Sequence, residues 1–82
     1  MEQVARTAKQ LANLLRQRRS ELGLTQVELA SQIALRQSTV SALETSANVR
    51  TATLLSALAA LDLEMVIRTR TKTSAKDIEA LF

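Results

Sequence analysis

One short stretch of the chain is rich in side chains that can form hydrogen bonds with nucleobases: Arg36, Gln37, Ser38 and Ser41. The apolar residues Val40 and Leu43 mark the buried side of a helix here, so the polar residues lie on or near its opposite side. A glutamine can both donate to and accept from adenine, a serine can do either, and an arginine suits guanine or a phosphate. The pattern predicts a helix that reads base edges in DNA. The alternative interpretation is a solvated helix face.

Other residues near this helix suit the phosphate backbone. Gln26 stands in the first turn of the preceding predicted helix, where free N–H groups and the helix dipole favour an anion. Thr39, Asn48 and Arg50 are further candidates for phosphate contacts. The net charge of +3 and the sequence pI of about 10.2 mildly favour a polyanionic partner.

The composition argues against an enzyme. The chain contains no Cys and no His, which removes disulfides, the usual zinc ligands, nucleophilic thiols and imidazole bases. No pair of carboxylates stands in an apolar context, so we expect no catalytic residue, no metal site and no cofactor. No apolar run approaches the roughly 20 residues of a membrane span. The start of the chain lacks the apolar core of a signal peptide, and we expect a cytoplasmic protein without a membrane partner.

Apolar repeats and capping signals predict four helices. The first covers 7–22, from the T-x-x-Q signal at Thr7 to Gly23. The second begins at the T-x-x-E signal of Thr25, the third covers 37–45, and the fourth begins with Thr51 as its cap. The second and third helices are close enough to form a helix-turn-helix. The apolar stripes of the first and fourth helices are formed by Leu11, Leu14, Leu15, Leu22, Leu54, Leu55, Leu58 and Leu61.

The stretch 63–70, LEMVIRTR, lacks the helical apolar repeat of the segments before it. Its β-branched residues and partial alternation predict one strand. A lone strand leaves its backbone groups unpaired, and a second copy of the chain is the obvious source of a partner. Met65, Val66 and Ile67 are therefore predicted at a dimer interface, with Met65 and Ile67 facing the helices.

Residues 1–72 are expected to form one DNA-binding and dimerisation domain, followed by a flexible tail over 73–82. In a helix, Ile78, Leu81 and Phe82 would share one face. We interpret these three residues either as part of a frayed terminus or as an anchor that becomes ordered on a protein partner such as a toxin.

The segment 24–44, LTQVELASQIALRQSTVSALE, resembles the Cro/CI-type (XRE) helix-turn-helix family. The matching positions are Thr25, Gln26, Glu28, Leu29, Ala30, Ile33, Leu35, Val40, Ser41, Leu43 and Glu44. The resemblance implies a lambda-repressor-like domain of four or five helices, all-α apart from one C-terminal strand. It also implies base reading by residues 36, 37, 38 and 41, a phosphate contact by Gln26, and an ion pair between Arg19 and Glu44.

Two positions depart from the family pattern. Ala34 stands where the family often has a turn glycine, so the turn either differs or carries strain, because a left-handed alanine is costly. The loop from Glu44 to Arg50 lacks the usual E-x-G sequence.

From about Thr7 to Lys72, the order of elements is similar to that of one branch of the family, the HipB-type antitoxins. This resemblance implies a homodimer with paired strands, repression of its own operon, and binding of a HipA-type kinase toxin. One alternative is a phage or restriction-modification regulator on the same fold. Another is a helical adaptor that binds only protein. The polar face argues against the adaptor, because protein-binding helices present apolar anchors.

Overall fold

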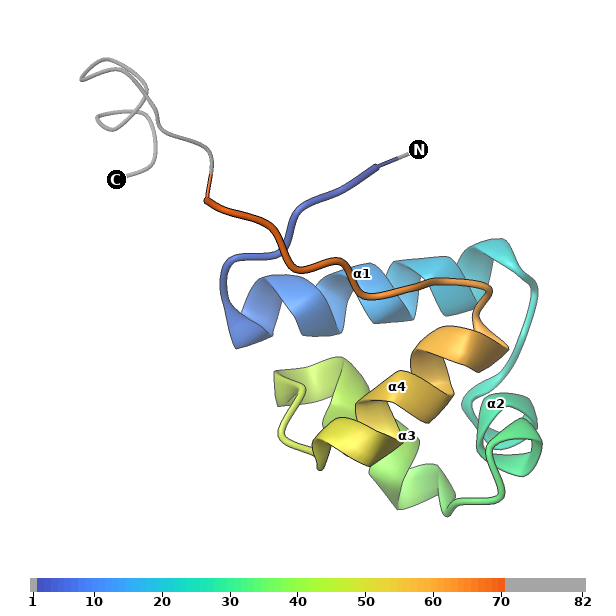
Figure 1. Ribbon diagram of the computed structural model, residues 1–82. Coiled ribbons are helices and arrows are strands. Elements are labelled where there is room, and N and C mark those ends of the chain that lie inside the picture. Colours follow the sequence, from blue (N-terminus) through green and yellow to red (C-terminus); the bar gives the residue numbers. More distant parts are fainter. Residues whose placement is uncertain (1, 71–82) are drawn as a thin grey trace.

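The computed structural model describes residues 2–70, which fold into four helices (Figure 1). The helices are α1 (Ala8–Glu21), α2 (Gln26–Gln32), α3 (Gln37–Ser46) and α4 (Thr51–Ala60). Helix α1 packs against α3, and α2 contacts both α3 and α4. The predicted helix-turn-helix is confirmed by α2 and α3. Within the described residues, no helix has the length and apolarity needed to cross a membrane. The proposed tail anchors Ile78, Leu81 and Phe82 lie outside the described residues.

The predicted capping box at the start of α2 is complete. The Glu28 N–H donates to the Thr25 hydroxyl at 3.1 Å, and the Thr25 N–H donates to the Glu28 carboxylate at 3.0 Å. The hydrogen bond from the Thr25 backbone holds the pKa of the Glu28 carboxyl below its usual range. At pH values above the unfolded-state pKa of Glu28, the cap therefore stabilises the fold. This contribution is lost as the pH falls through the lowered folded-state pKa.

The other predicted caps are only partly correct. Thr7 caps α1 by accepting from the Gln10 N–H at 3.1 Å, but the Gln10 side chain accepts from Arg6 rather than from Thr7. Thr51 is not a cap: it is the first residue of α4, and the N-cap is Arg50, whose side chain makes no capping hydrogen bond.

The chain leaves each of the four helices through a residue with left-handed backbone. These residues are Gly23 (φ 70°), Ala34 (φ 55°), Ala47 (φ 55°) and Asp62 (φ 57°). After α2, the N–H groups of Ala34 and Leu35 return to carbonyls of the last turn at 3.2 and 2.9 Å, which is a Schellman ending. The turn therefore keeps the geometry that favours glycine, and Ala34 carries the strain considered as one alternative from the sequence.

Replacing Ala34 with glycine should stabilise the protein. A left-handed alanine costs about 1–2 kcal/mol, and the greater freedom of glycine in the unfolded chain offsets about 0.5–1 kcal/mol of that gain. A gain of about 1 kcal/mol raises the Tm of a domain this size by about 4–8 °C. Thermal unfolding followed by circular dichroism measures the shift. Ala59→Gly, at an exposed helical position, is the control and should lower the Tm; Ala34→Gly with an unchanged or lower Tm would contradict the left-handed turn.

The core is aliphatic and joins all four helices. Its fully buried large side chains are Leu15, Leu29, Val40, Leu43 and Leu61. Two leucines expected in the apolar stripes are exposed: Leu22 is 41% exposed and Leu55 47%. Three others, Leu11, Leu14 and Leu54, are half-buried. Leu22 is the C-cap residue after the last turn of α1, and Leu55 lies on α4, whose buried residues are Ala57 and Leu58.

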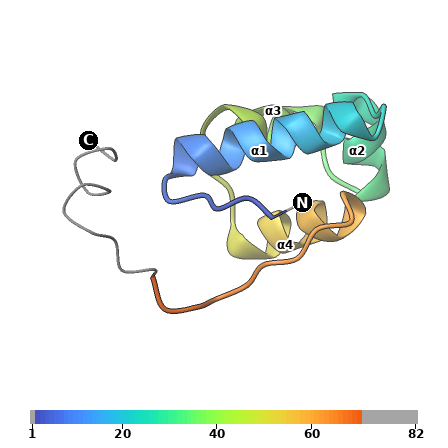
Figure 2. The same ribbon diagram turned by 90° about the horizontal axis from the view of Figure 1, so that it is seen from above.

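Residues 63–70 leave α4 and run back past α1 toward its N-terminal end (Figures 1 and 2). In the described chain they form no strand, because no other described segment pairs with them; their only backbone–backbone hydrogen bond is from Leu63 to Leu58. The predicted dimer residues Met65, Val66 and Ile67 are 47%, 69% and 92% exposed. The expectation that Ile67 faces the helices is therefore wrong within one chain. Pairing with a second chain stays a prediction.

Candidate nucleic-acid interface

Helix α3 presents the predicted polar face to solvent. Val40 and Leu43 are 0% and 1% exposed and fix the inner side of the helix, while Gln37, Ser38 and Ser41 are exposed. Arg36 is the N-cap of α3 and is exposed, and its side chain makes no capping hydrogen bond. The cationic and polar groups at the start of α3 are therefore accessible to a ligand.

Gln37 is held by a neighbour from α2. Its Nε2 donates to Oε1 of Gln26 at 3.4 Å, and Nε2 of Gln26 donates to Oε1 of Glu44 at 3.3 Å. The contact uses one of the two N–H groups of the Gln37 amide, so the other N–H and the carbonyl oxygen form the donor–acceptor pair that adenine engages. The sequence placed both glutamines at the interface but gave no sign that they touch.

The ion pair implied by the family resemblance is confirmed between α1 and α3. Arg19 Nε lies 2.6 Å from Glu44 Oε2, and a second guanidinium nitrogen lies 3.0 Å from Oε1, which is a bidentate arrangement. The two side chains are only 14% and 3% exposed. The Glu44 hydrogen bond raises the pKa of Arg19 further above its ordinary value. A third guanidinium nitrogen donates to the Leu24 carbonyl at 2.7 Å.

These contacts form one hydrogen-bonded chain from the interior to the surface. Arg19 fixes the Glu44 carboxylate, Glu44 accepts from Gln26, and Gln26 accepts from Gln37. A buried pair with satisfied hydrogen bonds restricts its own rotamers, so the orientation of the exposed amides is set by the core of the domain.

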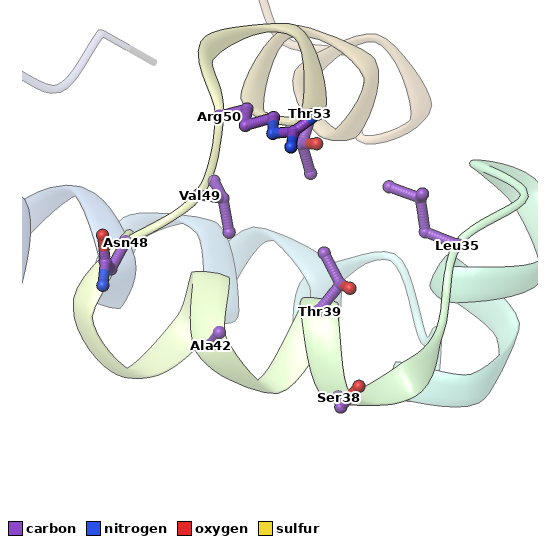
Figure 3. A pocket seen from close by; sticks show the side chains of 8 residues that line it. All are labelled: Leu35, Ser38, Thr39, Ala42, Asn48, Val49, Arg50 and Thr53. Atoms are coloured by element: carbon purple, nitrogen blue, oxygen red, sulfur yellow. The ribbon is translucent and has the colours of Figure 1, made fainter.

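A second group of predicted residues lines a cleft between α3 and the start of α4 (Figure 3). The cleft has a volume of about 400 Å³ and is lined by Leu35, Ser38, Thr39, Ala42, Asn48, Val49, Arg50 and Thr53. Four of these residues were singled out in the sequence. The cation of Arg50, the amide of Asn48 and the hydroxyl of Thr39 are groups that can bind phosphate oxygens. The walls are completed by four residues for which the sequence predicted no contact with DNA, namely Leu35, Ala42, Val49 and Thr53.

The predicted residues therefore form two adjacent sets on the same side of the helix-turn-helix. Gln26 and Gln37 are linked directly, while Ser38 belongs to both the exposed α3 face and the cleft. Arg36 and Ser41 are exposed on α3 but do not line the cleft.

Residues 10–65, which include all four helices from the third residue of α1 onward, match the model of a family described as a helix-turn-helix domain. The chain belongs to the helix-turn-helix family. Its fold is that of DNA-binding regulators rather than of a class of enzymes. None of the curated proteins matches the chain significantly.

Solved structures of HipB are similar to this helix-turn-helix protein over most of its length. HipB in a complex with an O2 20mer is 32% identical, with a TM-score of 0.80, and the match covers 87% of this chain and 100% of that one. HipB in a HipA-HipB-O2-O3 complex is also 32% identical, with a TM-score of 0.78 and coverage of 85% and 100%. These matches confirm the resemblance to the HipB branch.

A second kind of regulator is also similar, over a shorter span. The restriction-modification controller protein C.AhdI from Aeromonas hydrophila is 34% identical, with a TM-score of 0.62. The match covers 66% of this chain and 83% of that one.

Proposed function

We propose that this protein is a homodimeric, sequence-specific transcriptional repressor that inserts α3 into the major groove of operator DNA. The observation that carries the proposal is the hydrogen-bonded chain that ends at Gln37. An exposed glutamine that serves only solubility needs no fixed orientation, whereas an amide held by Gln26 has less conformational entropy to lose when it binds a base.

In this proposal the two sets of polar residues have different tasks. Base edges are contacted by Arg36, Gln37, Ser38 and Ser41. The phosphate backbone is contacted by Gln26, Thr39, Asn48 and Arg50. Phosphate contacts supply much of the affinity and fix the register of the protein, while base contacts supply sequence specificity.

The finer proposal is that the protein is the antitoxin of a HipBA-type module, binding a kinase toxin and repressing its own operon. Support comes from the extent of the likeness: the HipB match covers 87% of the chain, against 66% for C.AhdI. A restriction-modification regulator is the second candidate, supported by the 34% identity to C.AhdI. Purification of the tagged full chain from the organism that encodes it tests the distinction. A kinase that co-purifies supports the antitoxin role. A restriction gene beside the protein's own gene, with no co-purifying kinase, supports the restriction-modification role.

Replacing Gln37 with alanine should weaken binding to the DNA upstream of the protein's own gene. A bidentate base contact is worth about 1–3 kcal/mol, and a dimer loses it in both half-sites. Fluorescence anisotropy at a fixed salt concentration measures the effect, since phosphate contacts make the affinity strongly salt-dependent. Gln32→Ala, which removes an exposed amide at the far end of α2, is the matched control and should bind like the wild type. Equal affinity of the Gln37→Ala and wild-type proteins for this DNA would show that α3 does not read the bases.

A further inference from the structure

The cleft between α3 and the start of α4 has an apolar part that the phosphate contacts of the proposed function do not use. Arg50, Asn48 and Thr39 supply its cation, amide and hydroxyl. Three further lining residues carry only apolar side chains, and we call them the apolar wall: Leu35, Ala42 and Val49. In Figure 3 the side chains of Leu35 and Val49 extend into the same space between the two helices. A phosphate is bound by donors and cations, so these contacts leave the wall without a partner.

The fold holds the apolar wall in place. The Leu35 N–H donates to the Ala30 carbonyl at 2.9 Å in the turn after α2, which fixes the point from which its side chain starts. Leu35 is nevertheless 39% exposed and does not belong to the core cluster. Val49 packs against that cluster, and Ala42 is half-buried on α3. The wall is therefore an apolar surface of fixed shape, with Leu35 as its most exposed member.

Ala42 connects the apolar wall to the base-reading face of α3. It stands four residues after Ser38 in the helix, so the two side chains lie on the same side. Ser38 itself also lines the cleft. A base edge in contact with Ser38 therefore has an apolar neighbour one helical turn away, at about 5.4 Å along the axis.

A thymine nucleotide is the part of DNA that suits a cation beside an apolar surface. Arg50 is the only charged residue among the eight that line the cleft, so the cleft favours an anionic ligand. In the major groove thymine presents, besides its O4 acceptor, the C5-methyl group, to which apolar side chains bind. Cytosine carries a hydrogen at the same ring position. An apolar wall thus distinguishes the two pyrimidines by a contact that a polar side chain does not provide.

We propose that Leu35 and Ala42 contact the C5-methyl group of a thymine in each operator half-site, while Arg50 holds a neighbouring phosphate. The proposal rests on operator binding by α3 in the proposed function and adds one base that the site selects. The polar reading residues select bases by hydrogen bonds, whereas this contact selects by burial of one carbon. Operator affinity should therefore respond to the removal of a single methyl group although every base-pair hydrogen bond is kept.

Deoxyuridine substitution in the DNA upstream of the protein's own gene tests the contact, because it removes only the methyl group of a thymine. Each thymine of a half-site is replaced in turn, together with its mate in the other half-site. Fluorescence anisotropy with the full chain at fixed salt gives the affinity. One position should weaken binding about fourfold per half-site, or about 15-fold for the dimer, which is the effect of burying one carbon.

A second modified base separates contact from DNA shape. 5-Bromodeoxyuridine at the sensitive position should restore the affinity, since its bromine has nearly the size of a methyl group. A failure to restore it would assign the loss to the shape or deformability of the DNA and contradict the contact.

Protein variants identify the residues that meet the methyl group. Leu35→Ala should reduce the loss caused by deoxyuridine, and the double variant with Ala42→Gly should reduce it to less than about twofold per half-site. Each variant is compared on the thymine and deoxyuridine duplexes, so a general loss of stability or affinity cancels. Leu55→Ala, 47% exposed on α4 and outside the cleft, is the control and should keep the full loss.

Two results would overturn the inference while operator binding stands. One is a tightly bound operator that no deoxyuridine position weakens, and the other is a double variant that keeps the wild-type sensitivity to deoxyuridine. A wild-type chain that binds the upstream DNA no better than a scrambled duplex would instead overturn the proposed function itself.

Discussion

Glu44→Ala is expected to lower the free energy of unfolding by about 3–5 kcal/mol, because it leaves a buried cation without its counter-ion. The Glu44 side chain is 3% exposed and that of Arg19 14%, so water replaces the lost carboxylate only in part. One guanidinium nitrogen keeps its hydrogen bond to the Leu24 carbonyl, but the two nitrogens that faced the carboxylate lose theirs. At about 4–8 °C per kcal/mol for a domain of this size, the Tm should fall by more than 10 °C.

The control for this prediction is the exposed pair between Arg18 and Glu21 in α1. Its closest atoms are 3.7 Å apart and its side chains are 30% and 45% exposed, so Glu21→Ala should change stability by about 0–1 kcal/mol. Thermal and urea unfolding of both variants provides the comparison. A Tm of Glu44→Ala within a degree or two of the wild type would show that the Arg19–Glu44 pair is not buried in solution.

The double variant Arg19→Met with Glu44→Leu separates stability from DNA binding. Replacing both members of a buried pair with apolar residues is often neutral or stabilising, so this variant should recover most of the stability lost by Glu44→Ala. It still lacks the oxygen that accepts from Gln26. Its operator affinity should therefore remain below that of the wild type, because Gln26 and Gln37 lose their anchor to the core. Full recovery of affinity together with stability would show that the hydrogen-bonded chain does not position the reading residues.

Local features of the fold could be predicted from the sequence because their partners are a few residues apart. The capping box of Thr25 and Glu28 and the buried side of α3 follow from fixed helical spacing. The same rule failed for Leu55, which has helical spacing to the core but is 47% exposed on α4. The prediction from capping signals failed at Thr51, because a capping residue type does not determine which residue begins the helix.

Contacts between distant parts of the chain could not be obtained from spacing alone. The Arg19–Glu44 pair joins residues 25 positions apart and came from the family resemblance. The hydrogen bond of Arg18 to the Leu61 carbonyl spans 43 positions and was not foreseen. It ties the end of α4 to α1 and so determines where residues 63–70 start. The contact between Gln26 and Gln37 depends on how α2 and α3 are packed, which no periodicity encodes.

The strand predicted over 63–70 depends on a partner outside the chain. Its main chain makes one backbone–backbone hydrogen bond in the described residues, at Leu63, so the remaining donors and acceptors are available to a second copy. Val66 is suited to a test because its N–H has no acceptor within the described chain and its side chain is 69% exposed. A substitution of Val66 should therefore cost little stability within one chain, and its main effect should be on the formation of the dimer.

Val66→Pro should convert the protein to a monomer and abolish tight operator binding. Proline removes a ladder donor and is excluded from the interior of a paired strand. A monomer engages one half-site, and its affinity should approach the non-specific level, a loss of about 10³-fold or more. Sedimentation equilibrium measures the dimer, and anisotropy at fixed salt measures the affinity for the operator and for a scrambled duplex.

Val66→Ala retains the N–H and is the control: it should dimerise and bind far better than the proline variant. Because the reading residues of α3 are unchanged in all three proteins, the loss should be larger for the operator than for the scrambled duplex, where the proline variant loses only the phosphate contacts of the second copy. A dimeric Val66→Pro protein with wild-type operator affinity would show that residues 63–70 do not pair between chains.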